Sequence, residues 1–346
     1  MKHCYTNNIY YKRIIVLGPL PPPLGGVSVH VERVIAKLKE QYNDVMYSES
    51  CVEYRYQFFP IYIIRLLLML CWHRPDQVHL HTLYLSNGLC ELQWIMRLKK
   101  LLHYDALLIE HDCRYLYRRS EQWKSALNRL LPDIAQQIFI GNVTAQSYVD
   151  NKMAAAQCNT IESAFLQPEQ SQEQVILTSY PQELFQFIEN HSPLLLANAF
   201  QLSLLDGKDL YGFDSCIELL GKLKVAHNNI GFIFVLGSIG NETYYQQLRK
   251  LIVEYDLTDN CYFLIGQRQL WPLLKKIDLF VRPTLSDGAS VSIEEALWAG
   301  KPVVATNVCL RPQDVAVYDV GDSDQFYELV VRVLQKKATL NIQNSL

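Results

Sequence analysis

Short runs of apolar residues alternate along the chain with longer segments in which apolar residues recur every three or four positions. The first run, at 14–17, ends at Gly18, and helical spacing begins at Val27. The same succession of a run and a helical segment follows at 76–84 and 88–102, at 106–112 and 120–131, and at 136–142 and 144–153. Strands that alternate with helices in this way predict parallel β-α-β units.

The alternation loosens into a polar, proline-punctuated stretch at 167–192 and then starts again. Apolar runs separated by helical segments lie at 193–200, 231–240, 261–267, 278–284 and 302–308. Two similar α/β halves therefore stand in series, and a helical pattern at 324–337 closes the chain. We expect an α/β protein with two Rossmann-like, doubly wound parallel-sheet domains facing across a cleft. The expected parts are a first domain at 1–166, a linker at 167–192, a second domain at 193–323, and a C-terminal helix and tail at 324–346.

Composition narrows the class of protein. A length of 346 residues corresponds to two domains of roughly 150 residues each, and 49% hydrophobic residues suffice for well-filled cores. Lys and Arg total 32 against 35 acidic residues, without blocks of one sign, which argues against a nucleic-acid partner. Nine cysteines without a C-x-x-C pair, and a start without the features of a secretion signal, favour a cytoplasmic protein.

The longest apolar segment, at 58–72, is interrupted by Pro60 and Arg65 and is shorter than the ~20 residues of a membrane-spanning helix. One interpretation is a buried helix of the first domain. The alternative is contact with a membrane surface, because the aromatic and cationic side chains in and beside the segment favour lipid phosphates. These side chains are Tyr54, Arg55, Tyr56, Arg65 and Arg74.

In doubly wound domains, ligands bind at the loops that follow the carboxyl ends of strands. Gly25 and Gly26 occupy the first such loop, and Ser28 follows at the start of a helix. Backbone N–H groups and the helix dipole there favour an anionic ligand. The spacing does not fit G-x-G-x-x-G, and the alternative is that the two glycines only turn a proline-rich loop.

A second loop-to-helix junction carries two carboxylates. Asp287 and Gly288 follow an apolar run, and we expect a helix to start near Val291 or Ser292, with Glu295 in its first turn. Backbone N–H groups of that turn would bind phosphate, and the carboxylates would accept hydrogen bonds from hydroxyls. Alternatively, Ser292 and Glu295 form an S-x-x-E capping box and the Asp-Gly pair is an ordinary turn.

The segment "PTLSDGASVSIEEALWAGKPVVATNV" at 283–308 resembles the nucleotide-sugar motif of the retaining family-4 (group 1) glycosyltransferases. The resemblance extends over nearly the whole chain. The supporting segments are "GPLPPPLGGVSVHVERV", "HLHTLY", "IEHD" and "LYGFD". It implies a GT-B fold, with the acceptor on the first domain and the activated sugar on the second.

The resemblance also implies roles for single residues. Asp287 would hold hydroxyls of the transferred sugar, Glu295 the ribose of the nucleotide, and His111 would lie near the reacting centre. We therefore expect Asp287 and His111 in the catalytic site. The residues expected to bind the donor are Gly25, Gly26, Lys208, Arg268, Gly288, Ala289, Ser290, Val291 and Glu295.

The chain departs from the family at three positions. Asp287 replaces the usual first glutamate. A G-R pair and a K-G pair, whose cations contact the diphosphate in the family, are replaced by "NAF" at 198–200 and by Tyr211-Gly212. Lys208 is one candidate for the missing charge, and a solvated loop lysine is the alternative.

Histidines at strand ends are more often hydrogen-bonded structural residues than catalytic ones, and the roles of His79 and His81 stay open. The sequence contains neither a G-x-S-x-G elbow nor an H-E-x-x-H metal site, so no metal or cofactor is expected.

The predicted function is transfer of a sugar, with retention, from a nucleotide-sugar to a saccharide acceptor. That acceptor would be lipid-linked, as in bacterial surface polysaccharide synthesis at the inner face of the cell membrane. A non-catalytic nucleotide-sugar-binding or scaffold protein is the alternative. The interpretation as a dinucleotide-dependent oxidoreductase is a weaker alternative, because no G-x-G-x-x-G is followed by an acidic residue about 20 positions later.

Overall fold

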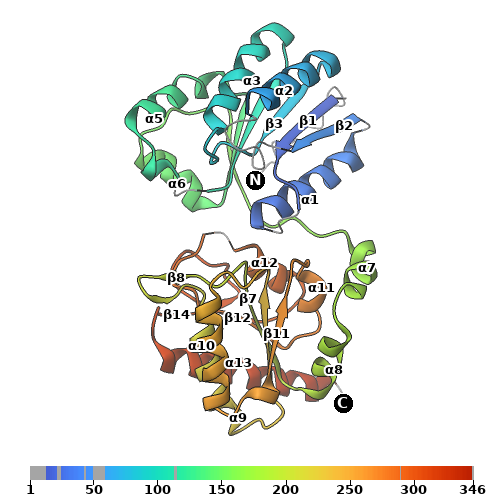
Figure 1. Cartoon of the computed structure of the whole chain (residues 1–346), viewed down its shortest axis with the longest axis vertical. Coiled ribbons are helices and arrows are strands. Elements are labelled where there is room, and N and C mark those ends of the chain that lie inside the picture. The colour runs from blue at the N-terminus through green and yellow to red at the C-terminus, as the bar shows by residue number, and fades with distance from the viewer. Residues whose placement is uncertain are drawn as a thin grey trace. The chain divides into compact units, whose positions relative to one another are not determined.

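The computed structural model describes residues 13–21, 25–42, 44–49, 59–112, 115–288 and 290–344. The chain divides into two units, Met1–Leu166 and Gln167–Leu346, and each contains one six-stranded parallel sheet flanked by helices (Figure 1). The expected α/β class with two doubly wound domains is confirmed. Some residues singled out from the sequence lie outside the described ones, namely Tyr54, Arg55, Tyr56, Phe58 and Ala289.

The sheet of the first unit has the strand order β2-β1-β3-β4-β5-β6, with every adjacent pair parallel. Its strands are β1 (Arg13–Gly18), β2 (Asp44–Glu49), β3 (Gln77–Leu80), β4 (Asp105–Glu110), β5 (Gln136–Ile140) and β6 (Asn159–Glu162). Its helices are α1 (Gly26–Gln41), α2 (Phe59–His73), α3 (Gly88–Leu102), α4 (Tyr115–Arg118), α5 (Glu121–Asn128), α6 (Asn142–Asp150) and the 3-10 turn η2 (Leu131–Asp133).

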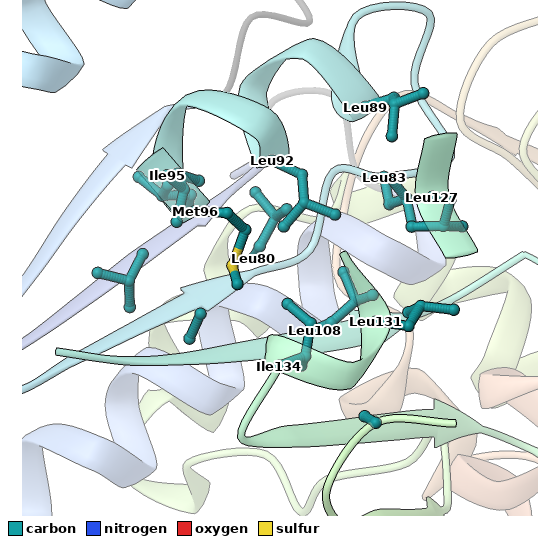
Figure 2. Packing of buried hydrophobic residues seen from close by; sticks show 14 of the residues in the cluster. Leu80, Leu83, Leu89, Leu92, Ile95, Met96, Leu108, Leu127, Leu131 and Ile134 are labelled. Atoms are coloured by element: carbon teal, nitrogen blue, oxygen red, sulfur yellow. The ribbon is translucent and has the colours of Figure 1, made fainter. Parts of the chain in front are cut away.

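Successive side chains of β1 enter opposite cores, as a strand with a period of two requires. Ile15 and Leu17 pack with α2, α3 and α5, whereas Ile14 and Val16 pack with α1. Figure 2 shows the larger core, in which side chains of α3 meet those of β3, β4, α5 and η2. Because both faces of the sheet are covered, its central strands β1, β3, β4 and β5 are largely apolar runs, which explains why they could be predicted.

The sheet of the second unit has the order β11-β10-β7-β12-β13-β14, again with parallel neighbours. Its strands are β7 (Leu194–Ala199), β10 (Gly231–Leu236), β11 (Cys261–Ile265), β12 (Leu279–Arg282), β13 (Val303–Thr306) and β14 (Val315–Tyr318), and a separate antiparallel pair is β8 (Leu204–Leu205) with β9 (Lys208–Asp209). Its helices are α7 (Glu173–Thr178), α8 (Gln182–Asn190), α9 (Phe213–Lys224), α10 (Glu242–Glu254), α11 (Trp271–Leu274), α12 (Val291–Trp298), α13 (Ser323–Asn344), η3 (Gln170–Gln172) and η4 (Thr258–Asn260).

Two cores cover the two faces of this sheet. One packs Leu195 and Phe234 against α9, α10 and α13, and the other packs Leu196 and Phe280 against α8, α11 and α12. The helix expected at 324–337 is therefore α13, which starts at Ser323.

The stretch at 167–192, expected to be a linker, is folded into the second unit. It contains α7 and α8, and Tyr180 and Leu184 are buried in the core beneath α12. The polar and proline-rich composition hid a helical pattern of apolar residues, because α8 presents only one face to the core.

Candidate functional site

The carboxyl edge of the second sheet brings together charged side chains from three segments. Arg282 is the last residue of β12, Asp287 lies in the loop that follows, and Arg311 lies in the loop after β13. Both arginines form ion pairs with Asp287, at 3.2 Å from Arg282 Nε and at 2.9 Å from Arg311 Nη1. The side chains are 11% exposed in Arg282, 10% in Asp287 and 3% in Arg311, so this ion triad is largely shielded from water.

The carboxylate of Asp287 is fully engaged. Its Oδ2 accepts from Arg282 Nε and Arg311 Nη1, and its Oδ1 accepts from Arg282 Nη2 at 3.3 Å and from the Gly288 N–H at 3.1 Å. An ionised carboxylate offers about four acceptor positions. A ligand hydroxyl could therefore bond to Asp287 only by replacing one of these donors.

Burial and charge act on Asp287 in opposite directions. Burial favours the neutral acid, but the guanidinium groups of Arg282 and Arg311 outweigh it, and the pKa of Asp287 is lowered from its ordinary value. The carboxylate is therefore ionised at neutral pH, and the triad carries one net positive charge.

Arg311 has one donor without a partner. Its Nε donates to the carbonyl of Thr306 at 3.0 Å and its Nη1 to Asp287, but the buried Nη2 has no hydrogen-bond partner among the described residues. A buried donor without an acceptor costs about 1–3 kcal/mol. This guanidinium is thus held by its neighbours with a donor still available.

Arg282 connects the triad to the neighbouring loops. Its Nη1 donates to the carbonyl of Asn198 at 2.8 Å, and its guanidinium lies 5.1 Å from the ring centroid of Tyr211. The loop of Tyr211 lies close to the end of β12, because a Cβ added to Gly212 would lie 2.3 Å from the carbonyl oxygen of Pro283. Gly212 also has a φ of +68°, so this close approach depends on glycine.

The helix after the triad is α12, which starts at Val291 as expected. Ser290 is the N-cap residue and its side chain makes no capping hydrogen bond, while Ser292 is already the second helical residue. The capping-box interpretation of Ser292 and Glu295 is therefore wrong, because a capping serine must precede the helix. The expected position of Glu295 in the first turn is also wrong, since Glu295 is the fifth residue of α12.

Glu295 is buried, with 5% exposure, and its charge acts on Tyr180 of the core beneath α12. Burial raises the pKa of the Tyr180 hydroxyl, and the charge of Glu295 raises it further. Tyr180 donates to the carbonyl of Gln269 at 2.5 Å, in the segment that also contains Arg268. The ribose-binding role expected for Glu295 stays a prediction.

The other residues expected at the donor are placed as follows. Gly288 is exposed, and a Cβ there would meet nothing within 4 Å, so the space beside its Cα is open. Arg268 donates to the carbonyls of Ser179 at 2.8 Å and Ile265 at 2.9 Å. Lys208 is exposed on β9, three residues before Tyr211. Ala289 is outside the described residues.

The first unit contains the expected glycine loop. Gly25 is the N-cap residue of α1, and its N–H donates to Ser28 Oγ at 2.9 Å. The space beside Gly26, the first helical residue, is open, since a Cβ there would meet nothing within 4 Å. The N–H of Gly25 therefore already has an acceptor in Ser28, and Gly26 is the more accessible of the two glycines.

Three histidines meet at the carboxyl edge of the first sheet. His81 Nδ1 and His111 Nε2 are 2.9 Å apart, and the ring of His30 lies 5.0 Å from that of His111. Burial lowers the pKa of all three. His30 Nδ1 lies 2.9 Å from the carbonyl of Ala164, whereas His81 Nε2 is buried without a partner among the described residues. Within the same described part of the chain, no cluster of His, Cys, Asp or Glu has the arrangement of a metal site.

The sequence pattern alone does not reveal three residues of these two edges. Arg282 closes the run at 278–284 without a predicted role, Arg311 has no predicted role, and His30 lies in a segment that predicts only a helix. For Arg282 there was a signal, because an arginine closing a buried parallel strand must have a polar partner. Arg311 follows an irregular loop, and nothing in the sequence places it beside Asp287.

Comparison with known proteins identifies the class to which the second unit is similar. Residues 207–337 match the model of the family described as glycosyl transferases group 1. The lipopolysaccharide glucosyltransferase WaaG of Escherichia coli (strain K12) is 30% identical over 98 residues, which cover 28% of this chain. The match spans only 25% of the length of that relative.

Solved structures resemble nearly the whole chain. HepE of Anabaena, in complex with UDP, superposes with a TM-score of 0.65 and 14% identity, covering 94% of this chain and 90% of HepE. A glycosyltransferase of Rickettsia africae superposes with a TM-score of 0.67 and 15% identity, covering 94% and 89%. At these identities the likeness establishes the fold, which is of the expected GT-B type.

Proposed function

We propose that this chain, which is similar to group 1 glycosyltransferases over residues 207–337 and has a GT-B fold, transfers a sugar, with retention, from a nucleotide-sugar to a saccharide acceptor. The acceptor in this proposal is a lipid-linked saccharide of bacterial surface polysaccharide synthesis, O-antigen or capsule. The similarity to a lipopolysaccharide glucosyltransferase supports a surface-polysaccharide acceptor, and the similarity to a protein crystallised with UDP supports a nucleotide-sugar donor.

The observation that carries the proposal is the junction between β12 and α12. It combines the start of a helix whose N-cap residue, Ser290, makes no capping hydrogen bond with its side chain, an exposed glycine at 288, and the largely shielded carboxylates of Asp287 and Glu295 on either side. Helix N-termini favour phosphate, and carboxylates accept hydrogen bonds from hydroxyls. Phosphate flanked by hydroxyl groups is the chemical pattern of a nucleotide-sugar.

In the proposed reaction, the bond between the anomeric carbon and the diphosphate oxygen breaks while the acceptor oxygen bonds to the same face of that carbon. The proton of the acceptor passes to the departing diphosphate oxygen. The chain contributes placement of the donor and stabilisation of the departing charge. Asp287 would exchange one arginine donor for a sugar hydroxyl, Glu295 would hold the ribose, and His111 would lie near the transferred sugar.

A panel of nucleotide-sugars tests this function directly. Purified protein is mixed with UDP-, GDP- and ADP-sugars, and we record the thermal shift and the slow release of free nucleotide. One donor should stabilise the protein and release nucleotide. Stabilisation without any release would favour the alternative of a non-catalytic binding or scaffold protein, and no response to any donor would contradict both.

We further propose that α2 contacts the membrane that holds the acceptor. One face of α2 is buried through Tyr62, Leu66 and Leu70, so the core interpretation of 58–72 holds for that face. The opposite face leaves four apolar side chains in water at helical spacing. They are Ile61, Ile64, Leu68 and Trp72, exposed by 48%, 57%, 65% and 85%.

The proposed occupant of this apolar face is an anionic lipid surface. Arg65 and Arg74 are exposed within and just after α2, and such cations favour lipid phosphates over a second apolar protein surface. None of the helices in the described residues is both long and apolar enough to cross a bilayer. In this proposal, α2 lies in the plane of the membrane surface with its apolar face toward the lipid.

Vesicle sedimentation tests the contact. The protein should sediment with phosphatidylglycerol vesicles, and high salt should release part of it, because salt screens exposed charges. Leu68→Glu should reduce sedimentation, whereas Val253→Glu, at a position 67% exposed on α10 of the other unit, should not. Equal recovery in the supernatant with and without vesicles would contradict the membrane contact.

A further inference from the structure

The second unit lacks the cationic residues that usually contact a diphosphate in group 1 glycosyltransferases, and the replaced positions lie at Asn198 to Phe200 and at Tyr211. We propose that Arg282 and Arg311 supply this charge and that the ion triad with Asp287 is the diphosphate-binding part of the site. This inference rests on the proposed function, since it names the residues that hold the donor of that reaction.

The placement of Arg282 is the first argument. Its guanidinium donates to Asn198 at 2.8 Å and lies over the ring of Tyr211 at 5.1 Å. One side chain from β12 thus contacts both segments in which the cations are missing, at Asn198 in one and at Tyr211 in the other. Asn198 belongs to β7 and Tyr211 to the loop before α9, so a guanidinium from β12 brings positive charge to both segments.

The free donor of Arg311 is the second argument. The Arg311 side chain is 3% exposed, and its Nε and Nη1 are held by Thr306 and Asp287, yet Nη2 has no partner among the described residues. Phosphate, like carboxylate, offers oxygen acceptors whose geometry matches a guanidinium fork. The loop of Arg311 also meets Gly288, since Cys309 Sγ donates to the Gly288 carbonyl at 3.3 Å.

The net charge of the ion triad and the N-terminus of α12 both favour an anionic ligand. Two guanidinium groups and one carboxylate leave a positive charge, and the N-terminus of α12 begins four residues after Asp287. Asp287 is then a positioning residue for the two arginines as well as a neighbour of the donor. Its carboxylate holds both guanidinium groups but also competes with phosphate for their N–H groups.

Titrations with nucleotides test the inference. UDP, GDP and ADP are titrated into the wild-type protein first, and the tightest of them is compared with its own nucleoside. Arg282→Gln and Arg311→Gln should each weaken binding of the diphosphate by about tenfold or more, as expected for a charge-assisted hydrogen bond. Binding of the nucleoside should change by less than about twofold.

Matched variants keep the test decisive. Arg282→Lys and Arg311→Lys retain the charge and are better tolerated in the fold, but they lose the bidentate geometry and should still weaken diphosphate binding. Arg249→Gln, on the exposed face of α10, should leave it unchanged. Asp287→Asn should bind the diphosphate at least as tightly as the wild type, because it removes a negative charge beside the arginines. If the triad served only to stabilise the fold, the variants at Arg282, Arg311 and Asp287 should all bind the diphosphate more weakly than wild type.

Two outcomes overturn the inference, and they differ in what else they overturn. If wild type binds a nucleoside diphosphate and the folded arginine variants bind it equally well, the triad does not hold the phosphates, while the proposed function stands. If wild type binds none of the three diphosphates, the proposed function and this inference fall together.

Discussion

Replacing Asp287 by asparagine tests the ion triad through stability. The change keeps the size of the side chain and one carbonyl acceptor but removes the charge between Arg282 and Arg311. All three side chains are at most 11% exposed, so the two guanidinium groups would be left in a shielded place without a carboxylate. We expect the second unit to be destabilised.

The size of the effect follows from the burial. Removing one partner of a buried ion pair costs about 3–5 kcal/mol, and the amide oxygen that remains favours the lower value of about 3 kcal/mol. For a unit of this size, each kcal/mol lowers the melting temperature by about 2–4 °C, which predicts a decrease of about 6–12 °C.

Calorimetric melting at pH 7 measures this decrease, with two controls. Asp287→Glu keeps the charge and should lose less than the asparagine variant. Asp256→Asn removes an exposed ion pair with Lys224, where the aspartate side chain is fully exposed, and should change the melting temperature little. Because the folded-state pKa of Asp287 is lowered, its stabilisation is present above about pH 4 and is lost as pH falls through the folded pKa. The gap between wild type and Asp287→Asn should therefore close in acid.

A melting temperature for Asp287→Asn within about 1 °C of wild type at pH 7 would refute the reasoning. It would mean that water or a loop movement solvates the charges of Arg282 and Arg311 in the variant, so that the carboxylate is not needed to hold the triad.

Three further changes have expected outcomes. Burial raises the pKa of Glu110, which accepts from Tyr115 and Tyr148, to about 7, so the unfolding free energy should fall by about 3 kcal/mol as pH rises from about 4.5 past 7. Urea unfolding at pH 5 and pH 8 should show this fall in wild type and not in Glu110→Gln. Gly212→Ala should lower the unfolding free energy by about 2 kcal/mol or more in the same assay, because its Cβ would collide with a backbone oxygen at a positive φ. Glu295→Ala should weaken nucleotide binding by about 1–3 kcal/mol in a calorimetric titration, and normal binding would exclude its ribose-binding role.

The central strands were predictable because both faces of each are buried. Val78 and Phe280 lie in runs that read as strands without any knowledge of their neighbours. The edge strands β2, β6 and β14 escaped prediction because edge residues such as Tyr47, Ile161 and Val317 remain exposed, and their sequences are short and mixed. Helices α7 and α8 were missed because one buried face suffices to dock them.

The candidate site could be predicted only in part. The junction around Asp287 and the start of α12 follow from local sequence, since turn residues precede an apolar helix. The partners of Asp287 do not, because Arg311 lies 24 positions away and reaches it from another loop. The meeting of His30 with His81 and His111 likewise depends on how α1 packs on the sheet, which spacing along the chain does not encode.

The most direct measurement of the central claim follows the products of the reaction by NMR. The protein is incubated with the nucleotide-sugar that it binds most tightly, and free nucleotide and the anomeric proton of the first-formed sugar product are recorded together. Our account predicts release of the nucleotide with the anomeric configuration of the donor preserved in the product, and far slower release in Asp287→Asn. Release with inverted configuration would contradict the retaining mechanism, and the absence of any release from a tightly bound donor would contradict glycosyl transfer itself.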